Sequence, residues 1–471
     1  MSEVMKKGEE LKEKLFYKKQ SVFEVRDASQ LDEARKYAEG YCKYLDNAKT
    51  EREAVTATKA ILSENGYSEY KLGDKVEVGG KYYLNNREKS IFAFRIGSEP
   101  IENGVRICAA HIDSPRLDLK QHPLFEDSGF GYLKTHYYGG IRKYQWPTIP
   151  LALHGTVTKC GGETVEIVIG EDDNDPVFVI TDLLPHLGRE QDTKILAKAF
   201  SGEGLNILIG STPYMEEDGT VTTVDEKVKL NLMAMLNEKY GIIEADFMSA
   251  ELCAVPKGKA MDVGLDRWLI GAYGHDDKVC AYPALTALLD TDNSVHTVMC
   301  VLADKEETGS DGTTGMQCSL LADLIDELCA QFGASSNVCR GNSMCLSADV
   351  SAGYDPLYPE VFEKRNSAIV NCGVVMNKYT GSGGKYSTND APSEYVATIR
   401  DMFAGENVLW QTAELGKIDV GGGGTVAKYV ANCNIDTVDL GVPVLSMHAP
   451  FEIISKGDLY ETHKAFVAFC K

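Results

Sequence analysis

Five short apolar segments of this 471-residue chain each lead into a side chain that can bind a metal ion. The segments and the residues at their ends are VRICAAH with His111, LIGAYGH with Asp276 and Asp277, VMCVLADKEE with Glu306 and Glu307, CLSAD with Asp349, and VPVLSMH with His448. Short apolar runs between turn residues are typical of buried strands, and open α/β sheets bind ligands at the carboxyl ends of their strands. We therefore expect the five ends to meet at one site.

The residue types at these ends indicate a metal centre without thiolate ligands. Two histidines and several carboxylates suit a catalytic zinc or a similar divalent ion, and cobalt and manganese tolerate the same nitrogen and oxygen donors. A one-ion catalytic site uses about three protein ligands and a water. Five ligands fit two ions about 3.5–4 Å apart, with one carboxylate shared between them.

Each element of this pattern also has a structural interpretation when it is taken alone. Asp276 and Asp277 could cap a helix, Glu306 and Glu307 could end a strand in solvent, and Asp349 could open a turn. The coincidence of five such ends is what favours a metal site. The remaining histidines outside the pattern are interpreted as hydrogen-bonded structural residues: His122, His136, His186, His275, His296 and His463.

The order of predicted elements indicates an α/β protein with an insertion. Residues 1 to about 66 have apolar positions at helical spacing, and 90–97 and 105–113 read as strands. From about 121 to 250, short strands alternate with Gly, Pro and Asp turns, which predicts a separate, mostly β unit. From about 262 strands and helices alternate, which predicts a sheet with helices on both faces.

Composition excludes several classes of partner. The chain has 48 basic and 70 acidic residues, a formal charge of −22, so it has no basic footprint for nucleic acid or an anionic membrane. No window reaches the ~18 apolar residues of a membrane helix, and the charged start is not a secretory peptide. The 13 cysteines are scattered without CxxC pairs, as in reduced proteins. We predict a cytoplasmic protein.

Five motifs together resemble the aspartyl aminopeptidase family of zinc metallopeptidases, and its bacterial aminopeptidase 1 branch in particular. The motifs are AHIDSPRLDLK (110–120), GHDDKVCAYPAL (274–285), DKEETGSDGTTG (304–315), LSADVSAGYDPLYPE (346–360) and SMHAP (446–450). The resemblance runs from about 20 to 470. It implies a mixed-sheet α/β catalytic domain made of residues 1–120 and 250–471, interrupted by a β oligomerisation domain at 121–249. It also implies a homo-oligomer, a tetrahedral dodecamer whose internal active sites admit short peptides.

The resemblance assigns the five ends to two divalent ions in each subunit, with zinc as the expected metal. His111 and Asp349 would hold one ion, and Glu307 and His448 would hold the other. Asp276 would bridge the two ions as the first carboxylate of its pair.

The resemblance also implies roles for residues around the metals. Asp113 would orient the imidazole beside it, and Glu306 would be the general base. His154 matches a histidine that reaches a neighbouring subunit's active site, although it could equally be a strand residue facing solvent. Lys378 matches a lysine of the substrate side-chain pocket, and Gly424 belongs to a glycine-rich turn near that pocket.

The predicted function is a two-metal aminopeptidase that removes the first residue of short peptides, with a metal-bridging water activated by Glu306. Ala352 and Asp355 stand where the family pattern has histidines, so acidic and neutral first residues both stay open. The alternatives are a related two-metal deacylase or carboxypeptidase, and a non-catalytic peptide-binding or cargo shell. A shell has no need of Glu306.

Overall fold

The computed structural model describes residues 7–471, so the predicted helical start at residues 1–6 lies outside the described residues. The described residues begin with four helices, α1 (Lys7–Leu15), α2 (Val22–Val25), α3 (Ala28–Asp46) and α4 (Glu51–Glu64), which confirms the helical prediction from residue 7 onward. Ser21, Asp27 and Thr50 cap α2, α3 and α4, and each takes part in a reciprocal capping box. These boxes satisfy backbone N–H groups that have no partner inside the helix.

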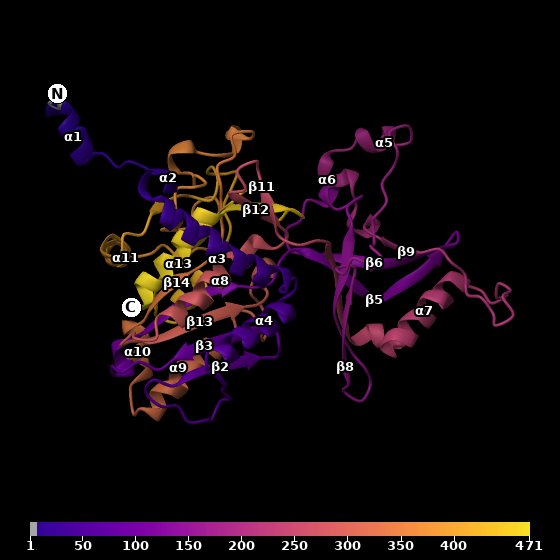
Figure 1. Cartoon of the computed structure of the whole chain (residues 1–471), viewed down its shortest axis with the longest axis horizontal. Helices are drawn as coiled ribbons and strands as arrows, with labels where there is room; N and C mark the ends of the chain where they lie inside the picture. Colours follow the sequence, from indigo (N-terminus) through magenta and orange to yellow (C-terminus); the bar gives the residue numbers. More distant parts are fainter. Residues whose placement is uncertain (1–6) are drawn as a thin grey trace.

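A nine-stranded sheet lies inside the larger of the two parts of the molecule (Figure 1). Its strands, in spatial order, are β1 (Ser68–Glu69), β2 (Lys81–Asn86), β3 (Ser90–Arg95), β13 (Thr297–Ala303), β4 (Val105–His111), β14 (Met344–Ser347), β18 (Asp436–Gly441), β16 (Val374–Asn377) and β17 (Trp410–Thr412). The four neighbours β13, β4, β14 and β18 are parallel, and Ala303 pairs with His111. The carboxyl ends of β13, β4 and β14 therefore meet at one edge.

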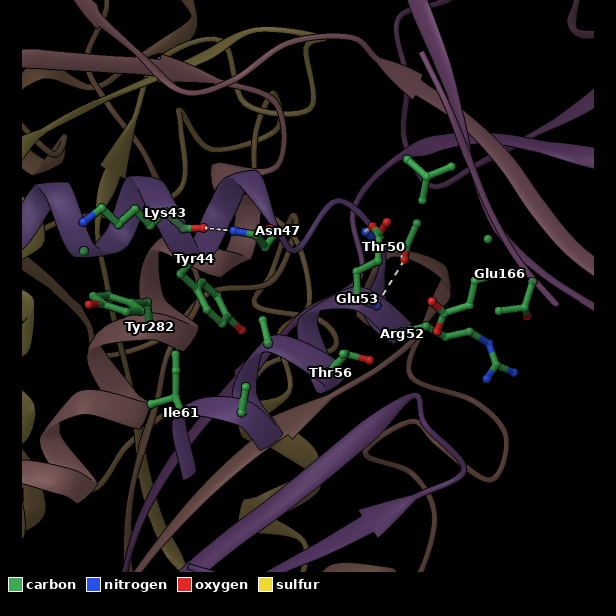
Figure 2. A pocket seen from close by; sticks show the side chains of 16 residues that line it. Lys43, Tyr44, Asn47, Thr50, Arg52, Glu53, Thr56, Ile61, Glu166 and Tyr282 are labelled. Carbon is green, nitrogen blue, oxygen red and sulfur yellow. Dashed lines mark hydrogen bonds between the residues drawn. The ribbon is translucent and has the colours of Figure 1, made fainter. Parts of the chain in front are cut away.

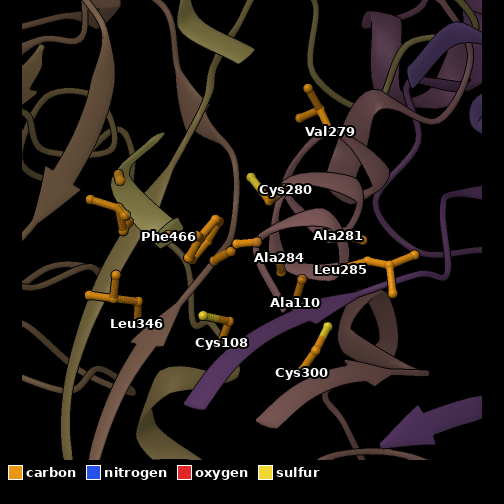
Figure 3. Close-up of a cluster of buried hydrophobic side chains, with 14 of the residues drawn as sticks. Cys108, Ala110, Val279, Cys280, Ala281, Ala284, Leu285, Cys300, Leu346 and Phe466 are labelled. Atoms are coloured by element: carbon orange, nitrogen blue, oxygen red, sulfur yellow. The ribbon is translucent and has the colours of Figure 1, made fainter. Parts of the chain in front are cut away.

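Helices cover both faces of this sheet, as predicted. One face packs against α3, α4, α8 (His275–Asp290), α11 (Ser393–Gly405) and α13 (Lys456–Cys470), and the other against α9 (Leu320–Gln331), α10 (Ser336–Asn342) and α12 (Ala427–Ala431). Along β4, Cys108 and Ala110 face the first set of helices, where Ala284 and Phe466 pack (Figure 3). Ile107 and Ala109 face the second set. This alternation buries the strand on both sides.

The insertion forms a second, antiparallel sheet with its own apolar core. Its strands, in spatial order, are β8 (Thr164–Ile169), β7 (Leu151–Thr158), β10 (Ala250–Pro256), β5 (Arg116–Asp127), β6 (Phe130–Tyr138) and β9 (Ile207–Gly210). The helix α7 (Lys227–Tyr240) and the short helices α5 (Arg189–Asp192) and α6 (Leu196–Ala199) accompany it. Leu117, Trp146 and Ile207 are buried in the core of this part. The sheet thus spans 116–256, slightly more than the expected 121–249.

Two of the five predicted strand ends do not belong to the main sheet. Asp276 follows β12 (Leu269–Ala272), which pairs with β11 (Met261–Val263) and β20 (Glu452–Ser455) in a separate sheet. His448 follows β19 (Pro443–Val444), which pairs with β15 (Ser351–Ala352). An apolar run indicates burial, and β12 and β19 are largely buried. The run does not say which sheet a strand joins. No helix in residues 7–471 is both long and apolar enough to cross a membrane.

Candidate metal centre

Three neighbouring parallel strands supply one side of the centre. His111 is the last residue of β4, and Asp349 follows β14. Glu306 and Glu307 follow β13 in a single 3-10 turn, which begins after Lys305 adopts a left-handed conformation with φ of +68°. Because the chain has left the extended conformation, the two adjacent glutamates need not point to opposite sides. The turn therefore allows the side chains of Glu306 and Glu307 to face the same site.

Asp276 lies between the two histidines. Its Oδ1 is 3.2 Å from His111 Nε2, and its Oδ2 is 3.2 Å from His448 Nε2. Asp349 Oδ1 lies 3.8 Å from the first imidazole nitrogen, and Glu307 Oε2 lies 3.6 Å from the second. The donors form two groups, one of His111, Asp276 and Asp349 and one of Asp276, Glu307 and His448, with ligand atoms within 4.8 Å of one another in each group. The structure thus brings all five predicted ligands together.

The donor set fits divalent cations. Within residues 7–471, His111 Nε2, Asp276 Oδ1 and Glu307 Oε1 are buried without a hydrogen bond, although buried polar atoms nearly always have a partner. Burial, followed by the neighbouring Asp349, raises the pKa of Glu306 to about 8. Burial, followed by Asp276, raises the pKa of Glu307 well above its usual range. Carboxylates crowded in this way are stabilised by positive charge placed between them.

Asp113 ties the first histidine to the turn that carries the glutamates. His111 Nδ1 lies 3.1 Å from the Asp113 carbonyl oxygen and 3.3 Å from its Oδ1. The same carboxylate accepts the backbone N–H groups of Glu306 at 3.1 Å and Glu307 at 3.2 Å, and the Tyr138 hydroxyl donates to it at 2.7 Å. A carboxylate in this position fixes the orientation of an imidazole ligand.

The inserted part also touches the centre, through backbone that sequence reasoning missed. His448 Nδ1 lies 2.9 Å from the carbonyl oxygen of Gly140. A Cβ atom on Gly139 would lie 3.1 Å from Glu307 Oε2, and one on Gly140 would lie 3.1 Å from His448 Nδ1. The turn after β6 therefore packs so closely against the second group of donors that an added Cβ atom would displace a neighbour by a few tenths of an ångström. The sequence offered only a pair of glycines after a predicted strand.

The backbone of Asp276 is held from both sides by buried residues to which the sequence pattern assigned no role. Its carbonyl accepts the Ser114 hydroxyl at 2.6 Å, and Lys278 Nζ donates to that hydroxyl oxygen at 2.6 Å. Its N–H donates to Glu452 Oε2 at 3.1 Å. The following peptide bond, to Asp277, is cis.

His275, directly before the shared carboxylate, is structural, as predicted. The Tyr41 hydroxyl bonds its Nδ1 at 2.7 Å, and its Nε2 lies 3.2 Å from the Ile270 carbonyl oxygen. Burial lowers the pKa of this imidazole to about 3, so it stays neutral.

His154 lies apart from the five ligands, in the wall between the two parts of the chain. It is 2% exposed, with Nδ1 2.7 Å from Glu53 and Nε2 3.1 Å from Glu171. Burial opposes its charged form, but the two carboxylates raise its pKa to about 8. The interpretation as a solvent-facing strand residue is wrong. Its predicted role in a neighbouring active site stays a prediction.

A pocket of about 490 Å³ opens between α3, α4 and the strands β7 and β8 (Figure 2). Tyr44 and Ile61 line it from the helices, Tyr282 from α8, and Glu166 from β8. Glu53, which contacts His154, is part of the same lining. The pocket therefore lies at the junction of the two parts, and none of the five ligands lines it.

Lys378 and Gly424 lie in two loops that pack on each other. Lys378 forms an ion pair with Asp390. The N–H of Gly381 donates to the carbonyl of Gly423 at 2.6 Å, and a Cβ atom on Gly424 would lie 3.3 Å from a neighbouring backbone oxygen. The predicted contact of both residues with substrate stays a prediction.

Comparison with known proteins identifies the family. A family model described as Aminopeptidase I zinc metalloprotease (M18) matches residues 44–470. The probable M18 family aminopeptidase 1 of Clostridium acetobutylicum is 48% identical over 451 residues, 94% of this chain and 96% of that protein. Crystal structures of the M18 aminopeptidase of Thermotoga maritima and of C. acetobutylicum aminopeptidase I have TM-scores of 0.91 and 0.90 at 41% and 45% identity, and each match covers 97% of this chain and 100% of the other. The predicted mixed α/β fold and aminopeptidase function are confirmed, and the chain belongs to the M18 family of aminopeptidase I zinc metalloproteases.

Proposed function

We propose that this aminopeptidase binds two divalent ions per chain and hydrolyses the first residue from short peptides. The observation that carries the proposal is the position of Asp276, whose two oxygens each lie 3.2 Å from a different imidazole. One ion would be held by His111, Asp276 and Asp349, and the other by Asp276, Glu307 and His448. The family description supports zinc as the metal; two ions per chain, and cobalt or manganese as substitutes, are part of the proposal.

Glu306 is proposed to move the proton in this reaction. Two bound divalent ions would polarise the scissile carbonyl and lower the pKa of a water toward neutrality. The Glu306 carboxylate accepts the proton of that water and returns it to the leaving amine. Its Oε2 lies 3.9 Å from His111 Nε2, and Asp113 holds its backbone N–H at 3.1 Å. Asp113 thereby fixes the position of the base relative to the first group of donors.

The proposed base is tested by Glu306→Gln, which removes the proton acceptor and keeps the side-chain volume. We expect the variant to retain the wild-type metal content while turnover falls by about 10²–10⁴-fold. Metal content is measured by mass spectrometry, and turnover with aminoacyl substrates. Wild-type turnover in the variant, with contaminating peptidase excluded by an inactive Asp276→Ala preparation, would remove Glu306 from this role.

Substrate class is tested with matched peptides that differ in one end. An aminopeptidase cleaves a peptide with a free amino terminus and leaves the amino-acetylated form intact. Cleavage of the acetylated form instead would favour the deacylase or carboxypeptidase alternative. A panel of acidic, neutral and basic first residues, assayed with zinc, cobalt and manganese, determines the preference. Lys378, His154 and Gly424 are proposed to contribute to that substrate site.

We further propose that residues 1–120 and 250–471 form the catalytic domain and that 121–249 form an oligomerisation domain of a tetrahedral dodecamer. Leu183, Leu184, Leu187, Ile195 and Leu196 of the insertion are between 49% and 66% exposed, and clustered exposed apolar residues are typical of interfaces. A structure described as the S. cerevesiae mApe1 dodecamer shares the fold, with a TM-score of 0.75 at 21% identity. Sedimentation that shows a stable monomer would contradict this assembly. The cytoplasmic location stays a prediction.

A further inference from the structure

One buried carboxylate contacts the backbone of two metal-ligating residues at once. Glu452, in β20, is 1% exposed. Its Oε1 accepts the N–H of His448 at 2.7 Å, and its Oε2 accepts the N–H of Asp276 at 3.1 Å. Each oxygen of the Glu452 carboxylate therefore accepts a backbone N–H from one of two residues. The side chains of the same two residues approach each other, with His448 Nε2 3.2 Å from Asp276 Oδ2.

These two bonds act outside the main sheet, where the only other backbone contact described for the two residues is that of the Ser114 hydroxyl with the Asp276 carbonyl. His448 lies in a turn, with φ of +64°, and Asp276 has non-helical backbone angles at the start of α8. Neither residue is held by the ladder of the main sheet, in contrast to His111, which ends β4 and pairs with Ala303. The backbone positions of Asp276 and His448 thus depend on side-chain contacts.

We propose that Glu452 is a positioning residue for the second ion, because it sets the separation of Asp276 and His448. The inference rests on the proposed two-ion site. Removal of one carboxylate oxygen frees one of the two backbones, and the donors then no longer meet in one geometry. The first ion is affected less, since His111 ends a strand of the main sheet and Asp349 closely follows another.

The chain offers a matched control in Asp458, which makes the same kind of contact elsewhere. Asp458, in α13, is fully buried, and its two oxygens accept the N–H groups of Asn371 and Gly373, both at 2.7 Å. Asp458→Asn and Glu452→Gln therefore each replace two accepting oxygens by one accepting oxygen and an NH₂ group that cannot accept a backbone N–H. Both changes are expected to lower the melting temperature, but only one lies at the metal centre.

The test is a zinc titration of the full chain after metal removal, with a chromophoric chelator as competitor. We expect two sites in the wild type and in Asp458→Asn. In Glu452→Gln we expect one near-normal site and one weakened by about 10-fold to 100-fold. Glu452→Asp keeps the charge but is one methylene shorter, so it should weaken the same site and provides a second variant if Glu452→Gln does not fold.

The outcomes separate this inference from the function on which it rests. If the wild type has two zinc sites, and Glu452→Gln and Glu452→Asp bind zinc with unchanged affinities, the inference about Glu452 is wrong and the proposed two-ion function stands. Equal weakening in Glu452→Gln and Asp458→Asn also overturns it, because the effect would then be general destabilisation. Fewer than two sites in the wild type overturn the proposed two-ion function, and the inference with it.

Discussion

The backbone contact between the insertion and the metal centre predicts that Gly139→Ala damages catalysis beyond its effect on stability. Gly139 has φ of +73°, and an added Cβ would lie 3.1 Å from Glu307 Oε2 and 3.3 Å from Glu307 Cβ. Ordinary contacts begin at 3.4 Å, so the nearer contact is short by 3.4 − 3.1 = 0.3 Å. If a displacement of 1 Å costs about 10²-fold, a shift of this size costs roughly fourfold in kcat/KM.

Gly129 provides the control for backbone strain, since it lies just before the other end of β6. Its φ is +82°, and an added Cβ would meet nothing within 4 Å. A left-handed alanine costs about 1–2 kcal/mol at either position, so both variants should lose a similar free energy of unfolding in denaturant titrations. Only Gly139→Ala should lower kcat/KM and weaken zinc binding. Equal kcat/KM in the two variants would refute the reasoning.

Two further predictions concern stability. Burial opposes the charged form of His154, but Glu171 and Glu53 raise its pKa from 6.5 to about 8, so the stability it contributes is present below pH 6.5 and lost as pH rises through 8. Unfolding titrations across this window should show the loss, roughly 2 kcal/mol at most, in the wild type but not in His154→Gln; identical profiles would count against the ion cluster. Phe466→Ala should lower the free energy of unfolding by about 3–5 kcal/mol, because Phe466 is fully buried between α13 and the sheet; a loss below about 1 kcal/mol would contradict the packing described.

Part of the metal centre could be predicted because its donors follow strands with a clear apolar signal. The runs that end at His111, before Glu306 and before Asp349 are buried on both faces, and buried parallel strands read as continuous apolar segments. Parallel neighbours bring their carboxyl ends to one edge, so proximity followed from topology. The sequence also predicts that Asp276 and His448 lie at the site. It does not predict the two short sheets whose strands precede them.

The contacts that hold the donors were not predictable from sequence. Gly140 acts through its carbonyl, and Glu452 binds the N–H groups of other residues. Every residue carries a backbone carbonyl and all but proline an N–H, so such partners leave no compositional signal. Tyr138 donates to Asp113 from the inserted sheet, at a register that depends on the irregularity in the pairing of β5 with β6. Period-two alternation places a strand but does not fix such a register.

The two-ion centre is tested most directly by anomalous diffraction from crystals of the wild-type protein grown with zinc. We expect two peaks per chain about 3.5–4 Å apart, one beside His111 and Asp349 and one beside Glu307 and His448, with the Asp276 carboxylate between them. A single peak, or two peaks that do not share Asp276, would contradict the proposed site.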